Sequence, residues 1–280
     1  MNRHPAGKGN TMQTKEQELM MALRGGLQGR FRNSFHLLNV ALEVLDDQML
    51  HSATPAQYDT LRPIFAQINA QLLLLRRLGE HAADAAIAPV LRQVCTPQPM
   101  ELLSQLRETE QIVNEILAQA KIEGTVRVEA DAGMQALLTM GDPALLDGLL
   151  ANLFSNSLAA RQPAQITLAC LPGTFLYRDN GPGLPPDAAV FLRTGVWSDR
   201  LLEQGGLGLP LVRAYAQAMG WTLTVPDGPG MELQFALPPC DMQLGSVVLE
   251  SGTVARSPQW RRQRLQEELA PLLAPPPETL

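Results

Sequence analysis

The stretch LLANLFSNSLAA, residues 149–160, combines leucines at helical spacing with two asparagines. The spacing of Leu149, Leu150, Leu153 and Leu158 predicts a buried helix. Asn152 and Asn156 are four residues apart and therefore share one face of that helix. Asparagine is a mediocre helix former and is costly to bury without hydrogen-bond partners. Taken alone, such a pair is more often a set of satisfied polar groups in a core than a ligand site.

Composition limits the class of protein. The chain has 280 residues, enough for one or two domains, and 45% of them are hydrophobic, which permits a sizeable core. The net charge of −6 disfavours a nucleic-acid binder that relies on bulk positive charge. Cys95, Cys170 and Cys240 show no metal-ligand spacing, and such isolated cysteines suit a reducing cytoplasm. We find no membrane span and no secretory leader, so we expect a cytoplasmic protein.

Two long amphipathic helices are predicted in the first third of the chain. Residues 1–14 are polar, with Gly and Pro, and we expect them to be disordered. Helical patterns follow from residue 15 to about residue 50 and from Pro55 to about residue 86, with Thr54 as the cap of the second helix. The short turn predicts an antiparallel hairpin within residues 15–94. The hairpin can pack on its own chain or pair with a second copy in a four-helix bundle, and we favour the homodimer.

The pattern changes after the linker CTPQPM, residues 95–100. A helix at 100–122 is followed by short strands at 125–131 and 136–141, and by the helix that contains the two asparagines, with Asp142 as its cap. Predicted β-hairpins at 165–180 and 221–237 flank a helix at 206–220. This order predicts an α+β sandwich over residues 97–239, with helices on one face of a sheet. Residues 240–280 form a less regular tail in which 260–273 can be helical.

Two glycine-rich motifs follow the asparagine pair. DNGPGLP, residues 179–185, comes directly after a predicted strand, and GGLGLPL, residues 205–211, opens a predicted helix. Each motif alone is typical of a turn or a loop, because Asn-Gly and Pro-Gly favour turns and a glycine-rich helix start is a weak phosphate signal. The three motifs in this order are far more specific than any one of them.

Together the motifs resemble the ATP-binding domain of the GHKL superfamily, and most closely that of sensor histidine kinases of two-component systems. NLFSN is similar to the N box, DNGPG and GGLGLPL to the two glycine boxes, and AVFLRTGVWSD, with Phe191, to the F box before the ATP lid. The preceding helices resemble the dimerisation and phosphotransfer hairpin of these kinases. The resemblance implies an α+β chain in which a helical-hairpin dimerisation domain precedes a Bergerat-type α/β sandwich that binds ATP.

The resemblance also implies roles for residues around Mg-ATP. Asn156 would bind Mg²⁺ directly through its amide oxygen, a hard ligand, and Asn152 would face the metal waters or the γ-phosphate. Related ATPases carry a glutamate base where Asn152 stands, and an asparagine there suits transfer rather than hydrolysis. Asp179 would accept the exocyclic amine of adenine, with Gly181 and Gly183 allowing the backbone to approach the ring. The other implied ATP-binding residues are Gly206, Leu207, Gly208 and Leu209, and Arg161 in place of the usual lysine or arginine.

The hairpin departs from the family pattern. The family's phosphoacceptor motif begins with His, followed by an acidic residue, with Asn or Thr four positions after the His. RFRNSF fits best with Gly29 in the His position, Arg30 in the acidic position and Asn33 in the Asn/Thr position. The phosphoacceptor and its base are then missing, whereas the position that helps to orient water in phosphatase reactions survives at Asn33. His36, seven residues after Gly29 and on nearly the same face, is either a displaced phosphoacceptor or a surface or packing histidine.

Two hypotheses of function follow. The first is a histidine-kinase-type signalling protein that transfers phosphate from Mg-ATP in a two-component system, with a response-regulator receiver as a possible partner. The second is a degenerate member that binds ATP and dimerises but acts as a phosphatase, scaffold or allosteric regulator without autophosphorylation on His. The hairpin argues against a serine-kinase anti-sigma factor. Asn152 in place of a glutamate argues against a chaperone or topoisomerase ATPase.

Overall fold

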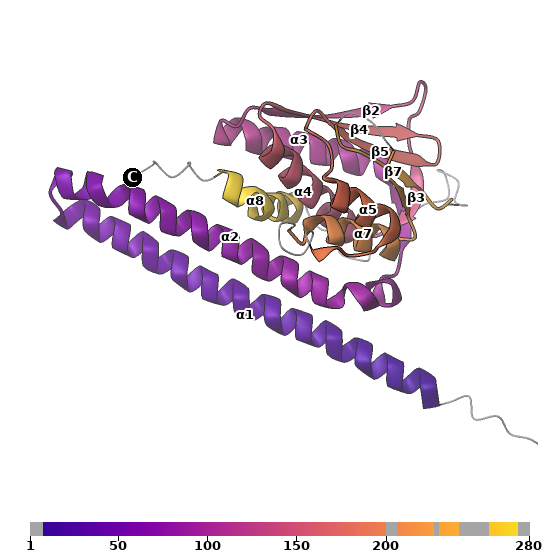
Figure 1. The fold of residues 1–280 in the computed structure, drawn as a ribbon, viewed down its shortest axis with the longest axis horizontal. Coiled ribbons are helices and arrows are strands. Elements are labelled where there is room, and N and C mark those ends of the chain that lie inside the picture. The colour runs from indigo at the N-terminus through magenta and orange to yellow at the C-terminus, as the bar shows by residue number, and fades with distance from the viewer. Residues whose placement is uncertain (1–7, 200–205, 227–229, 241–257, 274–280) are drawn as a thin grey trace, which may run out of the picture. The chain divides into compact units, whose positions relative to one another are not determined.

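The computed structural model describes residues 8–199, 206–226, 230–240 and 258–273 (Figure 1). The chain divides into two compact units, Met1–Val94 with Ala274–Leu280, and Cys95–Leu273. Among the described residues, every helix falls short of the combined length and hydrophobicity that a bilayer crossing requires. The predicted helical hairpin followed by an α+β sandwich is confirmed.

The first unit is an antiparallel hairpin of helices α1 (Lys8–Ser52) and α2 (Pro55–Val94). Helix α1 begins at Lys8, so residues 8–14, expected to be disordered, are helical, whereas residues 1–7 lie outside the described part. The helix extends this far because the residues after the first turn are mostly good helix formers, among them Met, Gln, Lys and Glu. Helix α2 also continues beyond residue 86, through Pro89.

The turn of the hairpin shows the predicted cap. The backbone N–H of Gln57 donates to Oγ1 of Thr54 at 3.4 Å, and the backbone N–H of Thr54 donates to Oε1 of Gln57 at 3.0 Å. This reciprocal pair is a capping box, which satisfies donors that the first helical turn leaves free. Pro55 occupies the first helical position, where a missing N–H removes no helical hydrogen bond.

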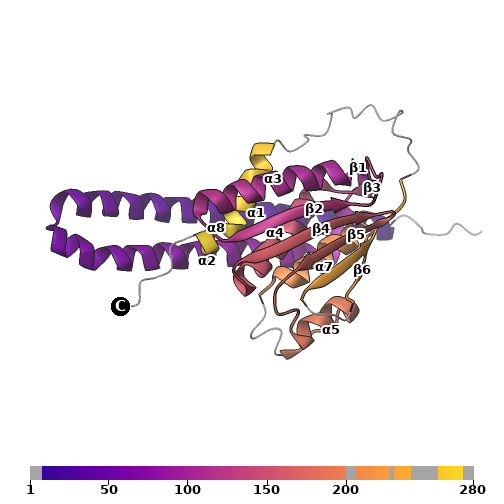
Figure 2. The same cartoon turned by 90° about the horizontal axis from the view of Figure 1, so that it is seen from above.

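The second unit is built on a five-stranded sheet with the order β2-β4-β5-β7-β6 (Figure 2). Strands β2 and β4 are parallel, and every other neighbouring pair is antiparallel. A separate antiparallel pair joins β1 to β3, and β1 was not predicted because it is short and lies in the linker. The strands are β1 (Gln98–Glu101), β2 (Gly124–Ala130), β3 (Leu138–Gly141), β4 (Ala164–Leu171), β5 (Thr174–Asp179), β6 (Thr222–Thr224) and β7 (Glu232–Ala236).

Three helices cover one face of this sheet: α3 (Leu102–Ala120), α4 (Pro143–Ala160) and α7 (Gly208–Ala218) (Figure 1). Asp142 caps α4 as predicted, since its carboxylate accepts from the N–H groups of Ala144 at 2.8 Å and Leu145 at 3.3 Å. The leucines of α4 that define the predicted pattern are buried. A further helix, α5 (Pro186–Thr194), contains the first part of the F-box-like segment, including Phe191.

Helix α8 (Pro258–Leu273) packs on α3 and α4, and it confirms the expectation of a helix near residues 260–273. Leu265 and Leu269 are buried along this contact. Arg261 is 4% exposed, and its Nε donates to Oδ1 of Asp147 at 2.8 Å. The same guanidinium also donates to Glu108 and Gln105 on α3. One arginine therefore ties α8 to both helices beneath it.

We expect Arg261→Ala to lower the free energy of unfolding of this unit by about 3 kcal/mol, because removing one partner leaves the carboxylate of Asp147 in a buried site. Urea denaturation followed by circular dichroism measures the loss. The matched control is Arg262→Ala on the next residue, whose partner Glu115 is 41% exposed. It should leave the unfolding midpoint nearly unchanged. Equal midpoints for the two variants would contradict a structural role for the Arg261 contacts.

Candidate functional site

Helix α4 brings the two predicted asparagines to one buried face. Asn152 is fully buried, and its Nδ2 donates to the carbonyl of Gly148 at 2.8 Å. Among the described residues, neither Oδ1 of Asn152 nor Nδ2 of Asn156 has a hydrogen-bond partner, although both atoms are buried. An unpaired buried polar atom costs about 1–3 kcal/mol, so two on one helix face point to a polar ligand rather than a satisfied core.

The second glycine motif lies directly against this pair. A Cβ on Gly208 would stand 2.8 Å from Oδ1 of Asn152 and 3.8 Å from Nδ2 of Asn156. The first distance is too short for a real side chain, so only glycine lets the start of α7 approach α4 this closely. Leu207 precedes α7 without a side-chain cap, which leaves the first backbone N–H groups of the helix available to a ligand.

The first glycine motif is organised around Asp179 at the end of β5. Its Oδ1 accepts from the backbone N–H groups of Gly181 at 2.9 Å and Met231 at 3.1 Å. A Cβ on Gly230 would stand 2.6 Å from the carbonyl oxygen of Asp179, and the φ of Gly230 is +79°. A side chain at Gly230 would therefore push the loop before β7 away from Asp179 and open the site.

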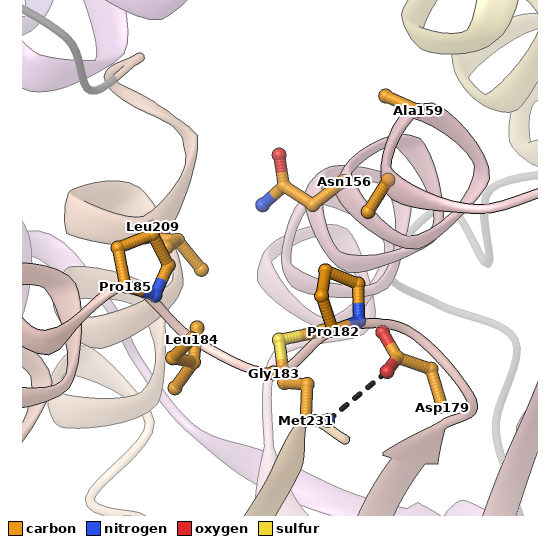
Figure 3. Close-up of a pocket in the computed structure, with 10 residues that line it drawn as sticks. Asn156, Ala159, Asp179, Pro182, Gly183, Leu184, Pro185, Leu209 and Met231 are labelled. Atoms are coloured by element: carbon orange, nitrogen blue, oxygen red, sulfur yellow. Dashed lines mark hydrogen bonds between the residues drawn. The ribbon is translucent and has the colours of Figure 1, made fainter. Parts of the chain in front are cut away.

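Between these motifs lies a cavity of about 320 Å³ (Figure 3). Asn156 and Asp179 lie on two sides of it and point towards it, and apolar groups make up most of the rest of its wall. A flat heterocycle with polar edges suits such a lining, because its faces meet apolar atoms and its edge meets the carboxylate. The other lining residues are Ala159, Ala160, Pro182, Gly183, Leu184, Pro185, Leu209 and Met231.

In the described part of the chain, no three carboxylate, thiolate or imidazole side chains gather in a way that could hold a metal ion. A divalent ion at this cavity would instead take the amide oxygen of Asn156 together with oxygens of a bound ligand and water. Mg²⁺ tolerates such a ligand set, because it retains waters and shares phosphate oxygens. The atom of Asn156 that lacks a partner is Nδ2, a donor suited to a phosphate oxygen, so the role of its amide oxygen as a metal ligand stays a prediction.

Other predicted site residues lie around or outside the cavity. Arg161 follows α4, and its Nη1 donates to the carbonyl of Asn180 at 2.9 Å, so it braces the loop next to Asp179. Gly206 faces open space. Arg193, in the F-box-like segment, donates through Nε to the carbonyl of Val225 at 3.1 Å. Residues 200–205 follow this segment, where the ATP lid is expected, and lie outside the described residues.

The candidate phosphotransfer residues lie on α1 in the first unit. Asn33 and His36 are exposed, and a Cβ on Gly29 would meet no atom within 4 Å. These side chains are therefore accessible on the hairpin. The chemical roles of Asn33 and His36 stay predictions.

Two residues of the site were missed at the level of sequence. Ser157 on α4 donates from Oγ to Oδ2 of Asp179 at 2.5 Å, and its Oγ lies 2.8 Å from the hydroxyl of Tyr177. Alternation along β5 places Tyr177 and Asp179 on the same face, which was the available signal. The partner on α4 could not be read from the sequence, because it depends on how helix and sheet pack.

Comparison with known proteins places the motifs in a family. Residues 141–241 match the family described as histidine kinase-, DNA gyrase B-, and HSP90-like ATPase. That range contains α4, β4, β5 and α7, and with them both asparagines, Asp179 and both glycine motifs.

Individual relatives are sensor kinases. The chain is 24% identical to the sensor protein QseC of Salmonella typhi over 155 residues, which are 51% of this chain and 34% of QseC. It is 31% identical to the signal transduction histidine-protein kinase AfsQ2 of Streptomyces coelicolor over 136 residues, which are 46% of this chain and 24% of that kinase. The chain thus spans about a third or less of the length of these relatives.

A solved structure of the cytoplasmic segment of histidine kinase QseC is also similar, with a TM-score of 0.41 and 19% identity over 57% of this chain and 94% of that segment. The family match covers the residues that form the cavity, and the curated relatives are sensor kinases. The chain therefore carries a GHKL ATPase domain of the sensor histidine kinase type.

Proposed function

We propose that the chain is an ATP-binding, histidine-kinase-type signalling protein that uses Mg-ATP for phosphotransfer in a two-component system. The observation that carries the proposal is the pair of unpartnered amide atoms on Asn152 and Asn156, set beside the cavity that Asp179 faces. A ligand with a polar phosphate end and an aromatic base with an amino group would satisfy both regions at once.

At the metal end, Asn156 would hold Mg²⁺ through its amide oxygen, and Asn152 would orient the water molecules or the terminal phosphate. Bound Mg²⁺ neutralises charge on the phosphate oxygens during transfer. An amide cannot act as a general base, so Asn152 holds a water without activating it for hydrolysis. This property favours transfer of the phosphoryl group to an acceptor over its loss to solvent.

At the base end, the carboxylate of Asp179 would accept a hydrogen bond from the exocyclic amine of adenine. Between the two ends, the N–H groups at the start of α7 would bind the phosphates, with Gly208 giving them room. The residues proposed for this contact are Gly206, Leu207, Gly208 and Leu209. Arg161 would act near the base, through the loop that it braces.

The second candidate function is a degenerate kinase that binds ATP and dimerises but acts as a phosphatase, scaffold or allosteric regulator. The observation that favours it is the sequence around Gly29, which has no imidazole in the position of the phosphoacceptor and Arg30 where an acidic residue belongs. Under this function Asn33 would orient a water, and a response-regulator receiver would be the natural substrate or partner.

We also propose that the hairpin forms a homodimer. Phe31, Leu38 and Leu45 are spaced by seven residues on α1 and are exposed, as are Leu75 and Leu78 on α2. Apolar side chains at this spacing form a stripe that a second hairpin can cover in a four-helix bundle. Burial of such a stripe is the ordinary driving force for association.

The metal role of Asn156 has a direct test. We expect Asn156→Ala to weaken binding of a Mg²⁺-loaded, non-hydrolysable ATP analogue by at least about tenfold, because a ligand of the ion is lost. Isothermal titration calorimetry measures the affinity. The internal control repeats the titration with ADP in EDTA, where wild type and variant should agree. An unchanged affinity with Mg²⁺ would refute the assignment.

Phosphotransfer to the hairpin is tested with γ-labelled ATP. We expect an acid-labile, alkali-stable label that is lost in His36→Ala, since phosphohistidine has this stability. His51→Ala is the matched control, because His51 is also an exposed histidine of α1, and it should keep the label. A protein that binds nucleotide yet takes up no label would instead support the degenerate function.

Dimerisation is tested by charge insertion into the apolar stripe. We expect Leu75→Glu to shift the protein from dimer to monomer in analytical ultracentrifugation, because a carboxylate would have to be buried between hairpins. Asn69→Asp adds a negative charge at an exposed position of α2 about 120° around the helix from Leu75, and it should leave the dimer intact. A monomeric wild-type protein would rule out the proposed pairing.

A further inference from the structure

Most hydrogen-bonding positions of the Asp179 carboxylate are already in use. Its Oδ1 accepts two backbone N–H groups, from Gly181 and Met231, and its Oδ2 accepts the hydroxyl of Ser157. A carboxylate offers about four lone-pair positions in all, so one is left, on Oδ2. That position can take one N–H donor from a ligand in the cavity that Asp179 lines.

The hydroxyl of Ser157 has a defined direction. A carboxylate can only accept, so Ser157 must donate to Asp179, and its own oxygen then accepts from the hydroxyl of Tyr177 at 2.8 Å. Burial raises the pKa of Tyr177 well above its usual range, which keeps this phenol protonated and able to donate. The relay runs one way, from Tyr177 through Ser157 to Asp179.

The relay is also rigid. Ser157 and Tyr177 are at most 1% exposed, and the ring of Tyr177 packs against Phe154 with centroids 6.1 Å apart. Ser157 belongs to α4 and directly follows Asn156, whereas Tyr177 and Asp179 belong to β5. The contact therefore joins the helix of the proposed metal ligand to the strand that ends at the proposed base-binding carboxylate.

We propose that Ser157, held by Tyr177, is a positioning residue that fixes the carboxylate of Asp179 and makes the cavity select purines with a 6-amino group. This inference rests on the proposed nucleotide function and extends it to base selectivity. With Oδ2 held by Ser157, its free lone pair keeps one orientation towards the cavity. A 6-amino group donates to that lone pair, a 6-oxo group is repelled by it, and an unsubstituted purine makes no bond there.

The test compares two nucleotides on the full chain: ATP, and purine riboside triphosphate, which lacks only the 6-amino group. The measured quantity is the ratio of the two dissociation constants, obtained by calorimetry with Mg²⁺ present. We expect wild type to prefer ATP, and Ser157→Ala to reduce this preference by about tenfold, as for the loss of orientation at a hydrogen bond to a charged group. Tyr177→Phe should reduce it in the same direction by about threefold, because Ser157 keeps its hydroxyl but loses its donor.

The ratio of the two dissociation constants distinguishes a loss of Asp179 positioning from a general loss of protein stability. A variant that is partly unfolded loses affinity for both nucleotides equally, which leaves the ratio unchanged. Ser155→Ala is the matched control, since Ser155 is buried on the same helix and its hydroxyl has no hydrogen-bond partner among the described residues. It should retain the wild-type ratio. Tyr177→Phe keeps the packed aromatic ring, so its ratio of dissociation constants tests the positioning role even if Ser157→Ala does not fold.

Two negative results have different meanings. Wild-type protein that binds neither nucleotide would overturn the proposed function itself. Wild-type protein that prefers ATP, with the same ratio in Ser157→Ala and Tyr177→Phe, would overturn only the positioning role. The second result would mean that the two backbone N–H groups on Oδ1 suffice to orient Asp179.

Discussion

Helix α4 is buried in the core of the Cys95–Leu273 unit and yet bears polar side chains. The candidate site depends on which of these side chains have hydrogen-bond partners within the fold. The leucines of α4 pack into the core and the cap at Asp142 sets where the helix begins. The amide Nδ2 of Asn152 donates to the carbonyl of Gly148 while its Oδ1 stays unpaired, and Ser157 bonds to Tyr177 and Asp179 on β5. The polar groups of this helix thus include some that the fold pairs and two, on Asn152 and Asn156, that the proposed ligand would pair.

Close approach of backbone to side chain is the second physical requirement of the site. Gly208 lets α7 contact the asparagine pair, and Gly230 lets the loop before β7 contact the end of β5. In both places a Cβ would stand less than 3 Å from another atom. These glycines bring the ends of three elements around one cavity, which explains why glycine-rich motifs recur in a chain whose remaining core is largely aliphatic.

The proposed roles of the hairpin and of the sandwich require different kinds of residues. The sandwich carries the residue types that the proposed function uses, namely two amides, a carboxylate and glycines, whereas Arg161 binds the carbonyl of Asn180. The hairpin has kept its apolar spacing, with exposed residues at Phe31, Leu38 and Leu45, while Gly29 stands where a phosphoacceptor is expected. Association needs only a pattern of apolar side chains, whereas phosphotransfer needs one imidazole in one place, so the two properties can be lost independently.

Periodicity and local motifs were sufficient to predict the hairpin, most of the strands and helices, and the caps at Thr54 and Asp142. The family resemblance added four residues of the cavity wall: Asn156, Asp179, Gly183 and Leu209. These features depend on neighbours within a few positions, which a single sequence displays. The strand β1, the helical start of α1 at Lys8 and the relay through Ser157 were not predicted. Strand β1 depends on β3, about 40 residues away, and the relay depends on the packing of α4 against β5.

The sequence by itself determined which residue types are available for a nucleotide: two amides one helical turn apart, a carboxylate after a strand, and glycines where the backbone must come close. Only the tertiary structure decided which atoms of those residues are already paired. Whether a lone pair of Asp179 is used by Ser157 or left to a ligand follows from the packing of helix on sheet, and no local pattern encodes that contact.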